Sequence, residues 1–272
     1  MKRLAGALLA GALLVAAPAE ASLIGISSEF PSAGIYSIDP TTGAATLITT
    51  TTSASSLVGA TFLDGTLYGS DMCGADCFSV NSIDVGTGVD TFVSNQDGSS
   101  NWHGLGADES AGLIYSIDID DGDTLKALDP TTGIVTTIGT GTGGADGRGM
   151  AYDDTHGILY ATGGGSLYTV DTTTGIATLV GNLGLSTDQL GLAYDETAGT
   201  LFLNSAELGT LYSVDTTTGA ATRIGLNGVD ASIDGLAWIG DETTPVPEPA
   251  TMLLLGTGLL GAGIRRRLRN RA

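Results

Sequence analysis

The chain is poor in basic residues, and most of those it has lie at its ends. Of the ten lysines and arginines, seven occupy the first three or the last eight positions. The body retains only Lys126, Arg148 and Arg223, against 30 acidic residues and a formal net charge of −20 for the whole chain. Such a body repels phosphate backbones and anionic headgroups, which disfavours nucleic-acid binding. Cations and neutral sugars remain as partners, and a merely solvated acidic surface is the simpler alternative.

Aromatic residues and helical patterns are also scarce, whereas glycine is abundant. Phe, Trp and Tyr make up 6% of the chain, but there are 42 glycines, with frequent Thr and Asp around them. Gly and Asp adopt the backbone conformations that tight turns need, so this composition predicts many short strands and an all-β fold. Sequence signatures of nucleophile elbows, zinc proteases, P-loops and dinucleotide sites are missing, and we expect a protein that is not an enzyme.

The N-terminus carries a targeting pattern. A positive start, Met1-Lys2-Arg3, precedes an apolar run over 4–17 and the sequence Ala19-Glu20-Ala21. This order predicts a signal peptide cleaved before Ser22. The run is too short for a membrane anchor, and no charges follow it to stop translocation.

The C-terminus combines a proline motif, an apolar segment and a basic cluster. The motif is Pro247-Glu248-Pro249, the apolar segment spans 250–264, and five arginines follow. This order resembles the PEP-CTERM sorting signal of Gram-negative bacteria that make exopolysaccharide. The resemblance implies an exosortase-type protease as processing partner, transient membrane insertion of a C-terminal helix, and a place on the cell surface or in the extracellular matrix. A retained single-span anchor is the alternative.

Two markers repeat along the body with the same spacing. Gly59, Gly104, Gly149, Gly191 and Gly235 each open a strand-like segment, and their steps are 45, 45, 42 and 44 residues. An Asp-x-x-x-Gly marker has the same steps, and its aspartates are Asp39, Asp84, Asp129, Asp171 and Asp215. A unit of about 44 residues with four short strands is typical of one β-propeller blade.

The ends of the repeat array complement each other. The last repeat has only its first strand, 235–239, whereas three strands without a first one open the mature chain at 23–27, 34–38 and 44–48. We therefore expect a five-bladed propeller with four-stranded blades, whose last blade is closed by the N- and C-terminal strands. The expected organisation is a signal peptide at 1–21, the propeller at 22–240, a linker with the Pro-Glu-Pro motif at 241–249, and the sorting helix with its arginine-rich tail at 250–272.

The repeats contain Leu-Tyr pairs, such as Leu159-Tyr160, upstream of the Asp-x-x-x-Gly marker. They resemble the repeats of bacterial secreted propeller proteins, a resemblance that names no ligand. We expect the pairs to pack between blades, with a sugar-stacking platform as the alternative.

Residues that precede the marker glycines should surround one mouth of the central channel. These positions vary between repeats, and the chemically distinctive ones form the candidate ligand site: Trp102, His103, Arg148, Gln189 and Asp234. Ordinary loop variation would give the same diversity. Three approaching carboxylates, Asp146, Asp188 and Asp234, leave open a glycoside hydrolase, which needs two carboxyl groups at a fixed separation.

Two further features concern metals and disulfides. The acidic run Asp118, Asp120, Asp121 and Asp123 allows calcium as a possible cofactor, although it departs from the EF-hand pattern, and a solvated turn is the alternative. Cys73 and Cys77 are the only cysteines. In an oxidising exported setting we expect a disulfide that fixes one loop locally, rather than a metal-binding pair.

These features predict an exported binding or adhesion module of the extracellular polysaccharide matrix. The alternatives are a secreted glycan-cleaving enzyme with carboxylates at the channel mouth and a structural matrix protein without a specific ligand.

Overall fold

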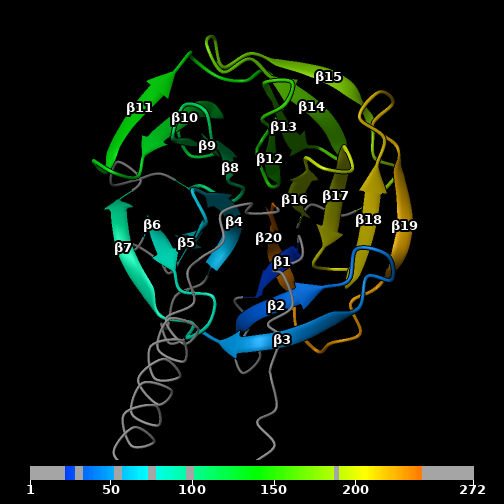
Figure 1. Cartoon of the computed structure of the whole chain (residues 1–272). Coiled ribbons are helices and arrows are strands. Elements are labelled where there is room, and N and C mark those ends of the chain that lie inside the picture. The colour runs from blue at the N-terminus through cyan, green and yellow to red at the C-terminus, as the bar shows by residue number, and fades with distance from the viewer. Residues whose placement is uncertain are drawn as a thin grey trace, which may run out of the picture. The chain divides into compact units, whose positions relative to one another are not determined.

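The described part of the chain forms a ring of five antiparallel sheets (Figure 1). The computed structural model describes residues 22–27, 33–51, 57–72, 78–95, 101–186 and 190–240. Each sheet has four strands and forms one blade, and no helix occurs among the described residues. The expected five-bladed propeller is confirmed.

In each blade, the strand named first below is the innermost and the one named last is the outermost (Figure 1). Blade 1 comprises β20 (Ile233–Ile239), β1 (Ser22–Ser27), β2 (Gly34–Ile38) and β3 (Ala45–Thr50). Blade 2 comprises β4 (Leu57–Leu63), β5 (Thr66–Met72), β6 (Phe78–Ile83) and β7 (Asp90–Asn95). Blade 3 comprises β8 (Gly106–Asp108), β9 (Leu113–Asp118), β10 (Thr124–Asp129) and β11 (Ile134–Ile138). Blade 4 comprises β12 (Met150–Asp153), β13 (Ile158–Gly163), β14 (Ser166–Val170) and β15 (Ala177–Asn182), and blade 5 comprises β16 (Leu190–Asp195), β17 (Thr200–Ser205), β18 (Thr210–Val214) and β19 (Ala221–Leu226).

Blade 1 joins the two ends of the repeat array, as the sequence predicts. Strand β20 pairs antiparallel with β1, with Ile239 opposite Ser22 and Trp238 opposite Leu23. Leu23 and Leu236 are buried in the same apolar cluster. The ring therefore closes through backbone pairing, so the innermost strand of blade 1 has a partner from the opposite end of the array.

The hydrophobic core consists of five clusters, each between two neighbouring blades. Aromatic rings of adjacent blades stack at three of these boundaries: Tyr115 on Tyr152, Tyr160 on Tyr194, and Phe202 on Trp238, with centroid distances of 6.0, 6.0 and 5.8 Å. Inter-blade packing of the Leu159-Tyr160 pair is confirmed, because both side chains are buried in clusters shared with a neighbouring blade. Each blade thus depends on its neighbours for its core.

The Asp-x-x-x-Gly marker forms the turn between the two outer strands of a blade. In blade 4, the carboxylate of Asp171 accepts hydrogen bonds from the backbone N–H groups of Thr173 and Thr174 at 2.8 and 2.9 Å. Gly175 has a φ of 75°, which favours glycine. A Cβ atom on Gly175 would lie 2.6 Å from the carbonyl oxygen of Ile138 in blade 3. The marker is therefore required both by the turn and by the contact between blades.

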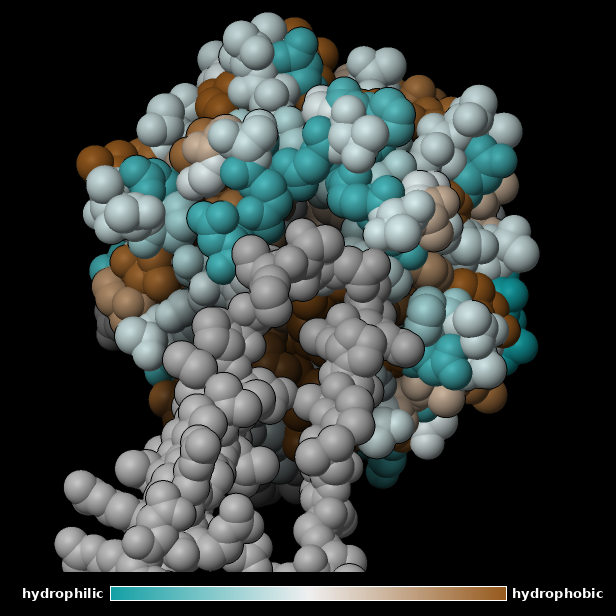
Figure 2. All heavy atoms as spheres, viewed as in Figure 1, coloured by the Kyte–Doolittle hydropathy of each residue, from teal (hydrophilic) through white to brown (hydrophobic). Residues whose placement is uncertain are grey.

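Hydropathy varies across the face seen in Figure 2. Hydrophobic residues are visible at the middle of the ring, and hydrophilic residues gather over several blades around it.

The chain divides into two units, 1–240 and 241–272. Among the residues that the structure describes, no helix is long and apolar enough to cross a membrane.

Candidate functional site

The marker glycines bring the innermost strands together at the mouth where the sequence predicts a ligand site. A Cβ atom on Gly59 would lie 1.9 Å from the carbonyl oxygen of His103, and one on Gly191 would lie 2.6 Å from that of Asp234. Only glycine permits backbones to approach this closely. The gap lined by Val58, Arg148 and Asp234 leaves no room for a water-sized molecule. We call this narrow end the amino-terminal mouth, because the innermost strands begin there.

Two predicted site residues influence each other at this mouth. Burial and the nearby charge of Arg148 lower the pKa of His103 to about 4, so the imidazole is neutral at pH 7. The Nε atom of Arg148 is buried and has no hydrogen-bond partner. Arg148 and Asp234 therefore line the narrow gap, and His103 lies close enough to Arg148 to be affected by its charge.

The other predicted site residues do not join them. Trp102 is fully buried in the cluster between blades 2 and 3, and its backbone pairs with Asp118. Its indole therefore serves the core and presents no exposed face to a ligand. Gln189 and the approaching carboxylate Asp188 lie outside the described residues, as do Cys73, Cys77 and the motif Pro247, Glu248 and Pro249. The disulfide stays a prediction.

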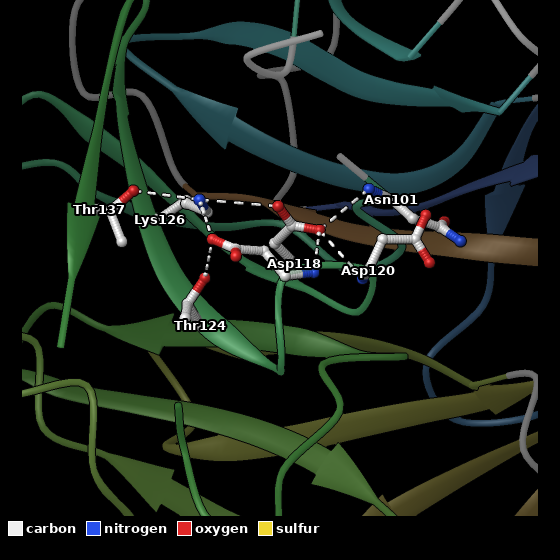
Figure 3. A network of polar contacts seen from close by, with 7 residues as sticks. Asn101, Asp118, Asp120, Thr124, Lys126 and Thr137 are labelled. Carbon is white, nitrogen blue, oxygen red and sulfur yellow. Dashed lines mark hydrogen bonds and ion pairs between the residues drawn. The ribbon is translucent and has the colours of Figure 1, made fainter. Parts of the chain in front are cut away.

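Two members of the acidic run predicted to bind calcium, Asp118 and Asp121, contact a lysine (Figure 3). The Nζ atom of Lys126 lies 2.8 Å from Oδ2 of Asp121, 3.6 Å from Oδ2 of Asp118 and 3.0 Å from the hydroxyl of Thr137. Lys126 and Asp118 are both buried. Among the described residues, no three Asp, Glu, His or Cys side chains group closely enough to hold a metal ion.

The second carboxylate oxygen of Asp118 organises the local turn. It accepts hydrogen bonds from the backbone N–H groups of Asn101, Asp120 and Asp121 at 3.1–3.3 Å. Asp123 continues the turn with a φ of 58°. The buried ammonium group of Lys126 therefore lies where the calcium hypothesis requires a cation. The ion pair between Lys126 and Asp118 links β10 to the turn before it.

The opposite end of the channel opens into a recess of about 130 Å³, at the carboxyl ends of the innermost strands. Its wall includes four aromatic side chains, Phe62, Tyr152, Tyr194 and Trp238. It also includes three carboxylates, Glu109, Asp154 and Glu196. None of the described residues that line the recess is Lys, Arg or His. A concave site with aromatic walls and a few hydrogen-bonding groups is typical of ligand pockets, and we call it the recess.

The three carboxylates are held by a chain of hydrogen bonds that runs from blade to blade. Each follows directly after the last residue of an innermost strand. The backbone N–H of Asp64 donates to both oxygens of Glu109, at 3.1 and 3.0 Å. The N–H of Glu109 donates to Asp154 at 2.8 Å, and that of Asp154 donates to Glu196 at 2.6 Å. Backbone geometry therefore fixes these acceptors around the rim.

The carboxylates lie close enough to affect one another. Burial, together with the charges of Glu196, Asp108 and Glu109, raises the pKa of Asp154 to about 6. Desolvation is the main cause of the raised pKa of Tyr152 and of Tyr194. A hydrogen bond from the Tyr152 hydroxyl to Asp108, and one from the Tyr194 hydroxyl to Asp153, raise these pKa values further. The aromatic wall is thus fixed by the acidic turns beneath it.

Asp154→Asn should stabilise the protein at pH 7 and reduce its pH dependence between pH 4 and 7. The folded pKa of Asp154 is raised, so the folded state binds more protons than the unfolded state in this window, and stability falls as pH rises through it. The amide can still accept the Glu109 N–H bond without the charge. We expect a gain of the order of 1 kcal/mol at pH 7 after allowance for solvent screening.

Urea unfolding of both proteins at several pH values measures this effect. Backbone hydrogen bonds lower the pKa of turn aspartates such as Asp171. Their contribution to the pH dependence of stability therefore falls mainly below pH 4, in both proteins. A variant whose stability stays parallel to that of the parent from pH 4 to 7 would contradict the assignment.

The recess residues carry a sequence signal of a different kind from the predicted one. Tyr152, Tyr194 and Trp238 occupy the same position in successive repeats, three residues after the marker glycine. Asp154 and Glu196 also share one repeat position. In a closed ring, equivalent positions of the innermost strands converge on the axis, so a repeated residue can form a site as well as a core.

Comparison with known proteins supports the targeting prediction and the fold separately. Residues 245–267 match the family model of the PEP-CTERM protein-sorting motif. A motif of this type is generally processed by an exosortase, and it marks the chain as exported and associated with the cell envelope. No curated relative was found by sequence.

Among solved structures, a chain in the crystal structure of a nidogen/laminin complex is similar to this one. The two share 14% sequence identity and a TM-score of 0.57, over 80% of this chain and 98% of that one. At this identity, the similarity supports the propeller fold and carries no information about the ligand.

Proposed function

We propose that this exported propeller is a binding or adhesion protein of the cell surface or extracellular matrix, and that the recess holds part of a non-acidic polysaccharide. The observation that carries the proposal is that aromatic side chains and carboxylates line one cavity, and that its described lining contains no basic side chain. The producing cell would be a Gram-negative bacterium that secretes exopolysaccharide. Binding would require neither a cofactor nor turnover.

Sugars offer the complementary chemistry to such a wall. Their C–H faces pack against aromatic rings, and their hydroxyl groups donate to carboxylate oxygens. Glu196 and Asp154 accept hydrogen bonds from backbone groups and line the recess, so they are oriented before a ligand arrives. Uronic acid or phosphate groups would meet repulsion from the same carboxylates. These properties favour neutral or amine-bearing glycans.

Glu196→Gln should weaken glycan binding by about tenfold or more. Its amide oxygen can still accept the backbone N–H of Asp154, but the charged acceptor is lost, and hydrogen bonds to charged groups contribute about 1.5–3 kcal/mol. A glycan array identifies the ligand, and isothermal titration of both proteins measures the difference. Asp120→Asn removes one exposed charge outside the recess and serves as the control. Equal affinities for all three proteins would contradict a ligand site in the recess.

A glycan-cleaving enzyme is the second candidate, because the raised pKa of Asp154 is the property that a general acid needs. Glu109 and Glu196 line the same recess and supply the further carboxyl groups that such a mechanism needs. The enzyme would be favoured if the protein releases oligosaccharides from a polysaccharide that it binds on the glycan array, and if Asp154→Asn abolishes this release. Binding without release supports the binding protein, and the absence of both supports a structural role without a specific ligand.

A further inference from the structure

The recess has two chemically different parts, one carboxylate and one aromatic. Asp154 and Glu196 both line the recess, and the backbone N–H of Asp154 donates to Glu196 at 2.6 Å. Burial raises the pKa of Asp154, and the charges of Glu196, Asp108 and Glu109 add to this effect. The ion pairs found in the described part of the chain involve Lys126 and His156, neither of which lines the recess. A cationic ligand would therefore lower the electrostatic cost of the ionised carboxylates.

The aromatic part presents an unused donor. The indole Nε1 of Trp238 is buried without a hydrogen-bond partner, and Trp238 lines the recess. One face of its ring stacks on Phe202 of blade 5, which fixes the indole in place. A buried donor without a partner costs free energy, and an acceptor on a ligand would restore the missing bond. The ligand that fits should thus carry an acceptor as well as a positive charge.

A bare metal ion does not meet these requirements. Calcium takes six to eight oxygen ligands. No group of three metal-ligating side chains is found among the described residues, so the rim carboxylates are spread around the cavity. Aromatic rings offer no ligand to a hard cation but attract organic cations through their electron-rich faces. The wall therefore fits an ammonium group attached to a larger, partly apolar body.

We infer that the preferred ligand of the recess is an amine-bearing sugar unit, in which the ammonium group contacts Asp154 and Glu196, the ring packs against the aromatic wall, and a hydroxyl oxygen accepts from Trp238. This inference rests on the proposed function and makes it more specific.

The test uses one oligosaccharide in two forms. Glucosamine oligomers with free amines and the same oligomers after N-acetylation are titrated into the mature full-length protein at pH 6.5. The free-amine form should bind at least tenfold more tightly, and added salt should reduce this preference, because exposed charges are screened. Glu196→Gln should reduce the preference, and Asp120→Asn should leave it unchanged.

The outcomes separate this inference from the proposed function. Equal binding of the two forms, or a preference that Glu196→Gln does not change, overturns the inference and leaves a neutral-glycan recess standing. If neither form binds but other neutral glycans do, the inference is likewise overturned and the neutral-glycan recess still stands. Silence towards every glycan overturns both.

Discussion

Removal of β20 should abolish cooperative folding of the ring. This strand supplies the buried residues Ile233, Leu236 and Ala237, and Trp238 stacks on Phe202 of blade 5. Burial of one large apolar side chain contributes about 1.5–3 kcal/mol, and several would be lost together, against a typical total stability of about 5–15 kcal/mol. The loss would also leave the backbone groups of β1 without their partner, so the open edge should promote aggregation.

Two shortened chains test this expectation. One starts at Ser22 and ends at Ser232, before the first residue of β20, and the other starts at Ser22 and ends at Thr244. Thermal melts followed by circular dichroism should show a cooperative transition for the longer chain alone. If both melt cooperatively at the same temperature, the closed ring is not needed for stability, and the pairing of β20 with β1 loses its assigned role.

Gly59→Ala should be the most damaging single methyl addition at the amino-terminal mouth. The new Cβ would lie 1.9 Å from the carbonyl oxygen of His103, so the backbones of blades 2 and 3 would have to separate. Overpacking of this kind costs about 3 kcal/mol or more, which corresponds to roughly 6–12 °C in melting temperature for a domain of this size.

Gly86→Ala is the matched control for this experiment. Its new Cβ would meet only a side-chain oxygen of Asp84 at 3.5 Å, an ordinary contact. Its stability should change by no more than about 1 kcal/mol. Comparable melting temperatures for the two variants would show that the close approach at Gly59 is relieved elsewhere and does not limit the ring.

The fold was accessible from the sequence because the same physical need recurs in every blade. The glycine at positions such as Gly59 and Gly191 is required where innermost strands touch, and the aspartate and glycine of the second marker are required by a turn and a blade contact. Each requirement recurs at the same position of successive repeats, so each leaves its mark at regular intervals. The incomplete repeats at the two ends then predicted the pairing of β20 with β1.

The recess is harder to predict from the sequence, because packing between blades also requires repeated aromatic residues. Tyr152 and Tyr194 do pack between blades, but they also line the cavity. Variation between repeats instead predicts a site at the amino-terminal mouth, where the glycines leave too little space for a ligand. Whether a repeated ring opens or closes at a given end depends on strand tilt and side-chain size around the axis, and local sequence does not determine these.

The seam between β1 and β20 has a mechanical consequence. The sorting segment follows Gly240 along the chain, so any tension applied through the C-terminus reaches β20 before the rest of the ring. Within its sheet, β20 pairs with β1 alone. Trp238 and Gly240 both belong to the wall of the recess. A load large enough to extract this strand would therefore also dismantle the wall of the recess.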